Sequence, residues 1–485
     1  MNWSRLDKSP WVLFPVFIFA VLTVATLVEN RPLSFSFDDS FITIANAELL
    51  VRGGADSFGN TVATGATSPV HMFLVALFTF FMPAPVASFV LLFIMATCYA
   101  VGLWKLLRVV GGGPFLSACG TVIGLVAAMA WIQLMNGLET GLAMAVIVWA
   151  VYCSQVRRDV PLAILVGLMP FVRPEFAVLS LLLALFSAWR LRREHIHLLK
   201  LASVAIFVAA VLGVLSWYFT GHVISPTAEA KSAYFDEDPV KFKDRLIMAF
   251  SALRSTAIVW PLAGLVMLPI VRDGWVYLGF VIAFVVAAAI SLPSAMFGYE
   301  YRYLYPFLPL GIVGWTAVAI HFRQIQPMIA LAALCYIIAF PSSGWRYYRG
   351  STDWNRAQED VALWAEANLP DDARILIHDA GYFAWHAQFV VEQPKGFVLI
   401  DGVGLKTPSV IKYHEEITGP SRGRDRGKAI DLIAREGQAQ YAIILDWPFW
   451  RDYEAYLRGA GWTVDLIYPN PGRYQIFRIA PPLPG

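Results

Sequence analysis

Two acidic residues, Asp38 and Asp39, stand next to each other shortly after the first apolar segment of the chain. Neighbouring carboxylates raise each other's pKa, and removal from water raises the pKa further. A carboxylate with a raised pKa can take the proton from a hydroxyl group that attacks a substrate. A structural role is the alternative, because an aspartate before a helix often caps it. We therefore expect one acid to act as a general base while the other caps or orients.

The elements around this pair have the composition of a membrane protein. The chain has 485 residues, of which 58% are hydrophobic and 15% charged, whereas soluble domains carry about 25% charged residues. Apolar stretches fill residues 1–344, and many approach the roughly 20 residues of a spanning helix. Residues 345–485 have the composition of a soluble domain. We predict a polytopic α-helical membrane bundle over 1–344 and an extracytoplasmic α/β domain over 345–485. The net charge of +2 is too small to indicate nucleic-acid binding.

The basic residues between the apolar segments indicate how the chain crosses the membrane. The apolar segments lie at 11–28, 67–82, 85–107, 114–134, 138–156, 160–172, 174–190, 198–219, 246–271, 275–293, 304–322 and 326–341. If 67–82 lies along the outer surface, the basic clusters between the other segments all become cytoplasmic, as the positive-inside rule requires. We therefore predict about eleven spans plus interfacial helices. The N-terminus is then inside, and the first loop, 29–84, and the C-terminal domain are outside.

The first external loop contains two predicted helices. After the acidic pair, apolar and polar residues recur at helical spacing, with Phe41, Ile44, Ala45 and Leu49 on one face and Thr43, Asn46 and Glu48 on the other. This pattern predicts an amphipathic helix in the membrane interface, ending at Gly53-Gly54. A second amphipathic segment begins at Pro69.

The C-terminal part alternates between helical and strand patterns. The sequence predicts helices at 357–368, 427–436 and 449–459, and strands at 374–378, 388–392, 397–401, 441–445, 462–468 and 473–479. No nucleophile constellation is recognisable, and we expect His378, Asp379 and His386 to be structural. The basic loop 419–427 is either solvated or in contact with an anionic glycan or lipid headgroups.

Several stretches resemble the GT-C membrane glycosyltransferases, and most closely the branch that contains the terminal arabinofuranosyltransferases. They are DDSFITIANAELLVRGG with GATSPVHMFLVAL, then NGLETGLAMAVIVWAV, RPEFAVLSLLLAL, SPTAEAKSAYF, YRYLYPFLPL and DAGYFAWHAQFVVEQPKGFVLIDGVGLKTP. They occur in the family's order over nearly the whole chain. At 226–231 the chain reads PTAEAK, where the branch commonly has NTFYAK, so the resemblance does not specify the donor sugar.

The resemblance implies transfer of a sugar from a polyprenyl-phosphate carrier to an acceptor hydroxyl outside the membrane, with inversion at the anomeric carbon. By position, Asp38 matches the family's catalytic base and Asp39 its acidic neighbour. Glu139 takes the place of an acid that helps to hold the acceptor or a metal, although an acid at a helix start is also stabilised by the helix dipole. The C-terminal domain is expected to recognise the acceptor or cover the site.

A lipid-phosphate leaving group would need cations near it. Lys231, Arg173 and Arg302 are expected to bind the donor phosphate, since Arg offers a two-pronged contact and Lys a point charge. The structural alternatives are a solvated charge for Lys231, an ion pair with Glu175 for Arg173, and an interfacial anchor for Arg302. Further supporting or acceptor-binding candidates are Glu175, Glu300, Tyr303 and His71.

The resemblance also suggests cofactors, partners and location. No cofactor is expected to be required, although Asp38, Asp39 and Glu139 could offer oxygen ligands to a divalent cation. The expected partners are a polyprenyl-phosphate sugar, an envelope glycan, lipid or protein acceptor, and the bilayer. The expected location is the bacterial inner membrane, with the site on its periplasmic side. The alternatives are a transporter or flippase of envelope precursors, an oligosaccharide polymerase or ligase, and a non-catalytic scaffold.

Overall fold

The structure is a computed structural model that describes residues 10–29, 33–35, 37–235, 258–291, 302–447 and 450–482. The chain forms two compact units. Unit 1 consists of Met1–Ser34, Ser88–Leu215 and Lys243–Gly350, and unit 2 of Phe35–Ala87, Ser216–Phe242 and Ser351–Gly485. Unit 1 thus contains most of the apolar helices, whereas unit 2 combines the first long loop with the C-terminal domain.

Unit 1 consists of helices at the apolar segments predicted from the sequence. They are α1 (Leu13–Glu29), α4 (Ala84–Val110), α5 (Pro114–Val126), α6 (Ala130–Met135), α7 (Thr140–Val156), α8 (Asp159–Val172), α9 (Phe176–Leu191), α10 (His195–Thr220), α13 (Val259–Ala263), α14 (Gly274–Ser291), α15 (Leu308–His321) and α16 (Gln326–Phe340). Residues 246–257 of the segment predicted at 246–271 lie outside the described residues.

One predicted segment, 114–134, is divided into two helices. α5 ends where Ala127 takes an extended conformation, with ψ 134°, and the chain then turns at Ala128, whose φ is 52°. The Tyr305 hydroxyl accepts a hydrogen bond from the Met129 backbone N–H at 3.0 Å. That bond satisfies one of the backbone donors that the break leaves without an intrahelical partner.

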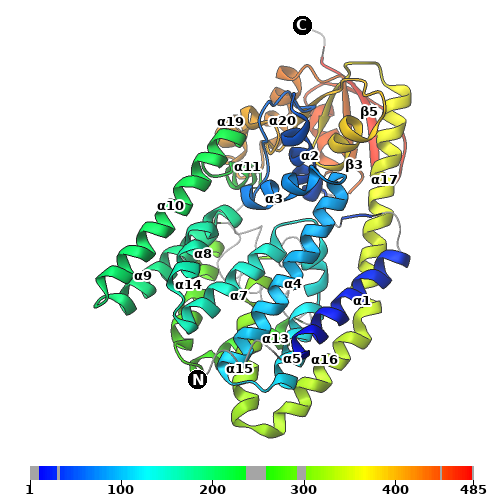
Figure 1. Ribbon diagram of the computed structural model, residues 1–485. Coiled ribbons are helices and arrows are strands. Elements are labelled where there is room, and N and C mark those ends of the chain that lie inside the picture. Colours follow the sequence, from blue (N-terminus) through cyan, green and yellow to red (C-terminus); the bar gives the residue numbers. More distant parts are fainter. Residues whose placement is uncertain are drawn as a thin grey trace. The chain divides into compact units, whose positions relative to one another are not determined.

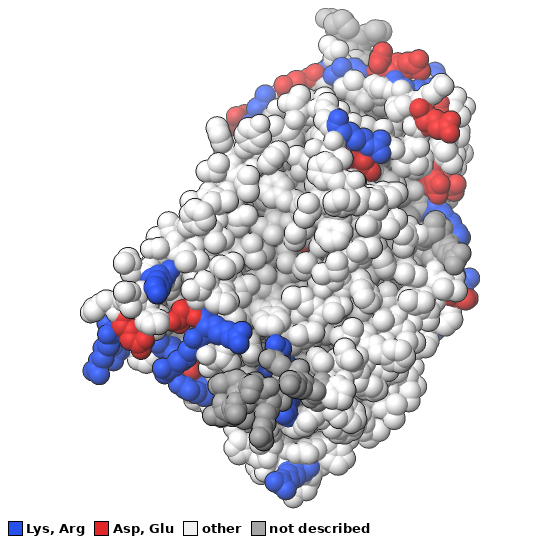
Figure 2. Space-filling model, in the orientation of Figure 1, with Lys and Arg blue, Asp and Glu red and all other residues white. Residues whose placement is uncertain are grey.

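Four helical segments of the described chain are long and apolar enough to cross a membrane. They are Pro10–Glu29, Ala84–Val110, His195–Thr220 and Arg323–Asn368, the last of which includes α16, a π-helical turn and α17 (Arg346–Asn368). Large apolar side chains on α1 and α10 are exposed, among them Phe17 at 63% and Ile206 at 68%. Figure 2 shows a broad uncharged surface over these helices, with basic residues gathered at the α9–α10 turn. The remaining apolar helices are shorter, so the predicted number of eleven spans stays a prediction.

Unit 2 contains a five-stranded mixed sheet (Figure 1). Its strands are β1 (Arg374–Ile377), β2 (Val398–Asp401), β3 (Tyr441–Leu445), β4 (Thr463–Tyr468) and β5 (Tyr474–Ala480), in the order β2-β1-β3-β5-β4. β1 pairs in parallel with β2 and β3, and β5 pairs antiparallel with β3 and β4. Buried residues of α17, α20 (Arg426–Glu436) and α21 (Asp452–Gly459) form the core with the sheet. The predicted α/β domain is therefore present.

The predicted strand at 388–392 is wrong. This stretch continues α18 (Tyr382–Trp385) as a π-helical turn, His386–Val390. The Gln388 side chain accepts a hydrogen bond from the Ser57 N–H at 3.0 Å and donates one to the Ala55 carbonyl at 2.9 Å. The Ser57 carbonyl in turn accepts the N–H of Leu399 on β2 at 2.7 Å. A loop of the chain's N-terminal part, rather than another strand, therefore covers this sheet edge.

The first loop of unit 2 forms α2 (Asp39–Arg52) and α3 (Pro69–Thr79), close to the two predicted helices. α2 ends at Gly53, where φ is 71° and the N–H returns to the Leu49 carbonyl. Asn46 and Glu48, on the polar face predicted for this helix, are buried. α3 has 11 residues and spans only about 17 Å. Like several other apolar helices of the described chain, it is shorter than the roughly 30 Å of a bilayer core, and its course along the membrane surface stays a prediction.

Candidate active site

Asp38 lies at the beginning of α2, and the residue as a whole is half-buried. It makes no capping hydrogen bond to α2, so the capping role considered for this side chain is not what it performs. Instead it accepts the N–H of Gly381 at 2.7 Å and the N–H of Tyr382 at 2.8 Å. The Gln358 side-chain amide donates a third hydrogen bond at 3.0 Å. Three donors from the C-terminal domain therefore fix the orientation of this carboxylate.

Gly381 permits this close approach. A Cβ atom at this position would lie 2.0 Å from the backbone oxygen of Asp38 and 2.7 Å from its Oδ2 atom. Real Cβ atoms are not found so close to a backbone atom, so a larger residue would push the two segments apart. The glycine in the DAGYF stretch is thus explained by its contact with Asp38.

The surroundings of Asp38 make it a stronger base than an ordinary aspartate. Burial raises the pKa of the Asp38 carboxyl well above its usual range, and the negative charges of Asp379 and Asp39 raise it further. The hydrogen bonds from Tyr382 and Gly381 lower this pKa, but burial outweighs them. A carboxylate with a raised pKa accepts a proton more readily in a transition state. The geometry therefore suits general-base chemistry at Asp38.

Asp39 is paired with Lys231, which lies on α11 (Thr227–Tyr234). The distance from Lys231 Nζ to Asp39 Oδ2 is 2.8 Å, and both side chains are less than 20% exposed, at 19% and 17%. Unit 2 thus brings together three of the predicted site residues. Lys231 is an ion-pair partner of the acidic pair rather than the solvated charge considered as its alternative.

A second group of predicted residues meets within unit 1. The Arg173 Nε atom lies 2.6 Å from Glu175 Oε1 and 3.6 Å from Glu139 Oε1. The Arg173 guanidinium lies over the ring of Tyr303 at 4.4 Å, and that of Arg302 lies at 5.5 Å from the same ring. We call these five residues the arginine cluster. The ion pair between Arg173 and Glu175, considered as the structural alternative, is therefore present.

The arginine cluster stands where helices begin and end. Arg173 follows α8 in extended conformation, with φ −150°, while Glu139 and Glu175 precede α7 and α9. Arg173 is only 1% exposed. Its Nη1 and Nη2 atoms have no hydrogen-bond partner among the described residues. A buried guanidinium with two unused nitrogens can bind a phosphate in two-pronged fashion, so the ion pair does not exhaust its donors.

Two further predicted residues are His71 and Glu300. His71 lies on α3 and is 1% exposed, and Glu300 lies outside the described residues. Among the residues that the structure describes, no group of three or more His, Cys, Asp or Glu side chains could hold a metal ion. A divalent cation at Asp38, Asp39 and Glu139 therefore stays a prediction without support from the geometry.

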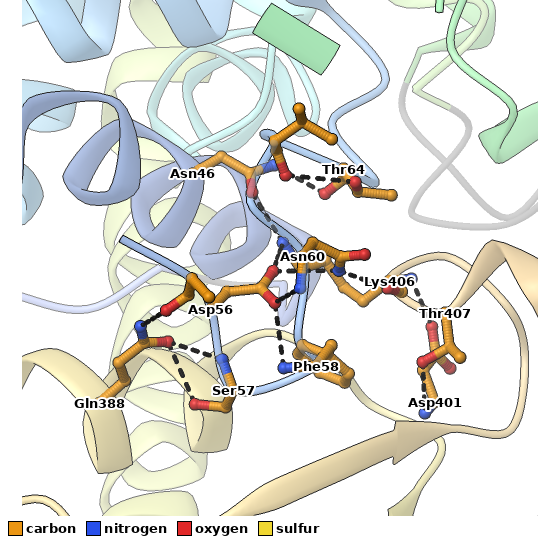
Figure 3. Close-up of polar contacts among 12 residues, drawn as sticks. Asn46, Asp56, Ser57, Phe58, Asn60, Thr64, Gln388, Asp401, Lys406 and Thr407 are labelled. Carbon is orange, nitrogen blue, oxygen red and sulfur yellow. Dashed lines mark hydrogen bonds and ion pairs between the residues drawn. The ribbon is translucent and has the colours of Figure 1, made fainter. Parts of the chain in front are cut away.

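A buried lysine that the sequence did not single out lies between the first loop and the C-terminal domain (Figure 3). Lys406 Nζ lies 2.7 Å from Asp56 Oδ2 and 2.7 Å from Asn46 Oδ1. Its carbonyl accepts the Asn60 side-chain amide at 2.7 Å. Burial lowers the pKa of Lys406, although the charge of Asp56 acts in the opposite direction. This contact attaches α2, and with it the acidic pair, to the C-terminal domain.

Comparisons with known proteins identify solved structures that have a similar fold. A family model described as a domain of unknown function (DUF8728) matches residues 346–477, and no curated protein matches the chain in sequence. The solved structure of ArnT from Cupriavidus metallidurans bound to undecaprenyl phosphate is 13% identical. The match covers 97% of this chain and 98% of that chain, with a TM-score of 0.59. The same protein in the apo state gives 13% identity, coverage of 95% and 97%, and a TM-score of 0.54.

The chain has a GT-C fold. The likeness to ArnT extends over nearly the whole length of both chains, and with the long apolar helices it indicates a multi-pass membrane protein. A weaker likeness is seen to the apo form of the Archaeoglobus fulgidus oligosaccharyltransferase, with 12% identity, coverage of 100% and 76%, and a TM-score of 0.48. None of these comparisons distinguishes the arabinofuranosyltransferase branch, which stays a prediction.

Proposed function

We propose that this protein is a membrane glycosyltransferase that moves a sugar from a polyprenyl-phosphate donor to an acceptor hydroxyl. The observation that carries the proposal is the Asp38 carboxylate, which is fixed by three donors and rendered more basic by its surroundings. The ArnT structure with bound undecaprenyl phosphate supports the choice of donor. The sequence resemblance suggests a pentose such as arabinofuranose, an envelope acceptor, and a site on the periplasmic side of the inner membrane.

In the proposed reaction, the acceptor oxygen attacks the anomeric carbon of the donor sugar while Asp38 takes its proton. The bond between that carbon and the phosphate oxygen breaks, and the polyprenyl phosphate leaves with the electron pair. The product is a glycoside with inverted configuration at the anomeric carbon. Asp38 must release its proton before the next turnover, and its partial exposure permits transfer to solvent.

Cations would stabilise the negative charge that develops on the leaving phosphate. In unit 2, Lys231 lies next to the acidic pair, and Asp39 holds it in place through their 2.8 Å contact. In unit 1, the Nη1 and Nη2 atoms of the buried Arg173, which have no hydrogen-bond partner within the described part of the chain, suit a phosphate group. Glu139 and Glu175 would orient that guanidinium. Lys231, Arg173 and Arg302 are thus our candidates for binding the donor phosphate, each judged by the contacts within its own unit.

The proposal is tested by transfer from purified donors. Proteoliposomes containing the wild type or Asp38→Asn would be given a panel of polyprenyl-phosphate sugars, and released polyprenyl phosphate and glycosylated product would be quantified. We expect product with the wild type and none above background with Asp38→Asn. Asp465→Asn, which removes an exposed charge from β4, is the matched control and should retain transfer. Translocation of a lipid-linked sugar without transfer would instead favour a flippase.

A further inference from the structure

A chain of hydrogen bonds connects Asp38 to a second acid in the C-terminal domain. The Gln358 side-chain amide donates to Asp38 at 3.0 Å and also to the Tyr474 hydroxyl at 3.3 Å. The Tyr474 hydroxyl in turn donates to the Asp379 carboxylate. Asp379 follows β1 and lies two residues before Gly381, whose N–H binds Asp38. Both carboxylates are therefore held by the same short set of elements.

The direction of these hydrogen bonds is fixed by the backbone of the chain. The Asn355 Oδ1 atom accepts the Phe35 N–H at 3.0 Å, and the Asn355 amide nitrogen donates to the Phe35 carbonyl at 3.2 Å. The same amide nitrogen lies 3.4 Å from the Gln358 Oε1 atom, to which it donates. The Gln358 nitrogen must then point to Asp38. Burial raises the pKa of Tyr474 well above its usual range, so the hydroxyl stays protonated and donates.

Asp379 lines a small cavity together with two members of this hydrogen-bond chain. The cavity lined by Gln358, Asp379 and Tyr474 has a volume of about 10 Å³, and its other lining side chains are apolar. That volume accommodates roughly one water molecule. It is far too small for a sugar, and the hydrogen bonds through Tyr474 and Gln358 connect Asp379 to Asp38.

We propose that Asp379 is a positioning residue for the base, holding Asp38 in place through Tyr474 and Gln358 and strengthening it by its negative charge. This inference rests on the proposed function. It assigns to the C-terminal domain a part in the chemistry itself, in addition to covering the site. It also revises the sequence-based expectation that Asp379 is merely structural.

The other groups that face Asp38 act in known directions. Asp39 of α2 adds a negative charge, which Lys231 of α11 partly offsets. Tyr382 of α18 contributes its N–H, and Tyr474 of β5 is a neutral phenol. Asp379 and Asp39 thus both place negative charge near Asp38. Asp39 is paired with Lys231, whereas the His378 Nδ1 atom lies 3.4 Å from Asp379 Oδ1.

The test is the pH dependence of kcat/KM for Asp379→Asn, with Asp379→Glu and Asp465→Asn as controls. Asparagine still accepts the Tyr474 hydrogen bond but removes the charge, so the acid limb should move about one pH unit lower. Glutamate keeps the charge and should restore the wild-type limb, and Asp465→Asn should not move it. An unchanged limb in Asp379→Asn, or an equal shift in Asp465→Asn, would overturn the proposal.

A second variant protects the test against misfolding of the first. Gln358→Met removes the donor that favours ionised Asp38, so the acid limb should move to higher pH, opposite to the effect of Asp379→Asn. No shift in Gln358→Met would also overturn the proposal. The titration of the Asp38 carboxyl can be followed independently of activity by infrared difference spectroscopy, with Asp38→Asn to identify the band. If the Asp38 carboxyl titrates at a lower pH in Asp379→Asn but the wild type transfers no sugar, the proposed function is wrong while the link between Asp379 and Asp38 stands.

Discussion

Replacing Lys406 by Met should destabilise the attachment of the first loop to the C-terminal domain. The side chains of Lys406 and Asp56 are 2% and 5% exposed, so solvent screens their 2.7 Å contact little. Asp56 also accepts the N–H groups of Phe58 and Asn60 at 3.0 and 2.8 Å. Methionine fills a similar volume but leaves the Asp56 charge buried without its cation. Breaking a buried pair in this way costs about 3–5 kcal/mol.

Hydrogen exchange measured by mass spectrometry gives this cost for the loop directly. At about 1.4 kcal/mol for each factor of ten, the peptide containing Phe58 and Asn60 should exchange roughly 100- to several-thousand-fold faster in Lys406→Met. Lys412→Met is the control, because the Lys412–Glu436 pair at 3.6 Å is about half exposed, at 51% and 52%, and it should leave exchange unchanged. Adding Asp56→Asn to Lys406→Met should recover part of the protection, since the uncompensated charge is then gone. Wild-type exchange in Lys406→Met would refute this reasoning.

Three further predictions concern the candidate site. Gly381→Ala should lower the melting temperature in detergent and abolish transfer, because its Cβ would displace the N–H groups of Gly381 and Tyr382 from Asp38. Each such hydrogen bond to a carboxylate contributes about 1.5–3 kcal/mol. A melting curve like that of the wild type would contradict this prediction. Arg173→Gln should weaken binding of polyprenyl phosphate about 10- to 100-fold, measured by thermal shift with the lipid, whereas the exposed Arg192→Gln should bind normally. In the wild type, Asp38 becomes protonated as the pH falls and can then no longer act as the base. Because its pKa is raised, kcat/KM should fall at a pH well above the ordinary aspartate pKa of about 3.9. A midpoint of this pH profile near about 3.9 would argue against Asp38 as the base.

Local patterns were sufficient to predict most helices and strands. The strand at Tyr441–Leu445 and the helix end at Gly53 agree with the structure, because hydrophobic periodicity and glycine conformation are properties of neighbouring residues. The break between α5 and α6 was missed, since no glycine or proline marks it in the sequence. The strand predicted at 388–392 was wrong because an apolar stretch this short also fits a buried helical turn.

Contacts between candidate site residues could be predicted only where the two residues are close in sequence. The other candidates came from the resemblance to a known family. The ion pair of Arg173 with Glu175 joins residues two positions apart and was considered from the sequence. Gln358 and Gly381 bind Asp38 from 320 and 343 positions away, and no local pattern indicates such contacts. The buried Lys406 was missed for the same reason, because its partners Asp56 and Asn46 belong to a distant loop.

The most direct test of the central claim is single-turnover transfer of a radiolabelled sugar from a polyprenyl-phosphate donor by purified wild type and Asp38→Asn. Asparagine keeps the size of the side chain, and its one oxygen can still accept from Tyr382 and Gln358. It loses the hydrogen bond from Gly381, and it cannot take the acceptor's proton. We predict a loss of about 10²- to 10⁴-fold in the transfer rate with donor binding retained. A transfer rate within a few-fold of the wild type, at equal protein level and donor occupancy, would contradict the assignment of Asp38 as the base.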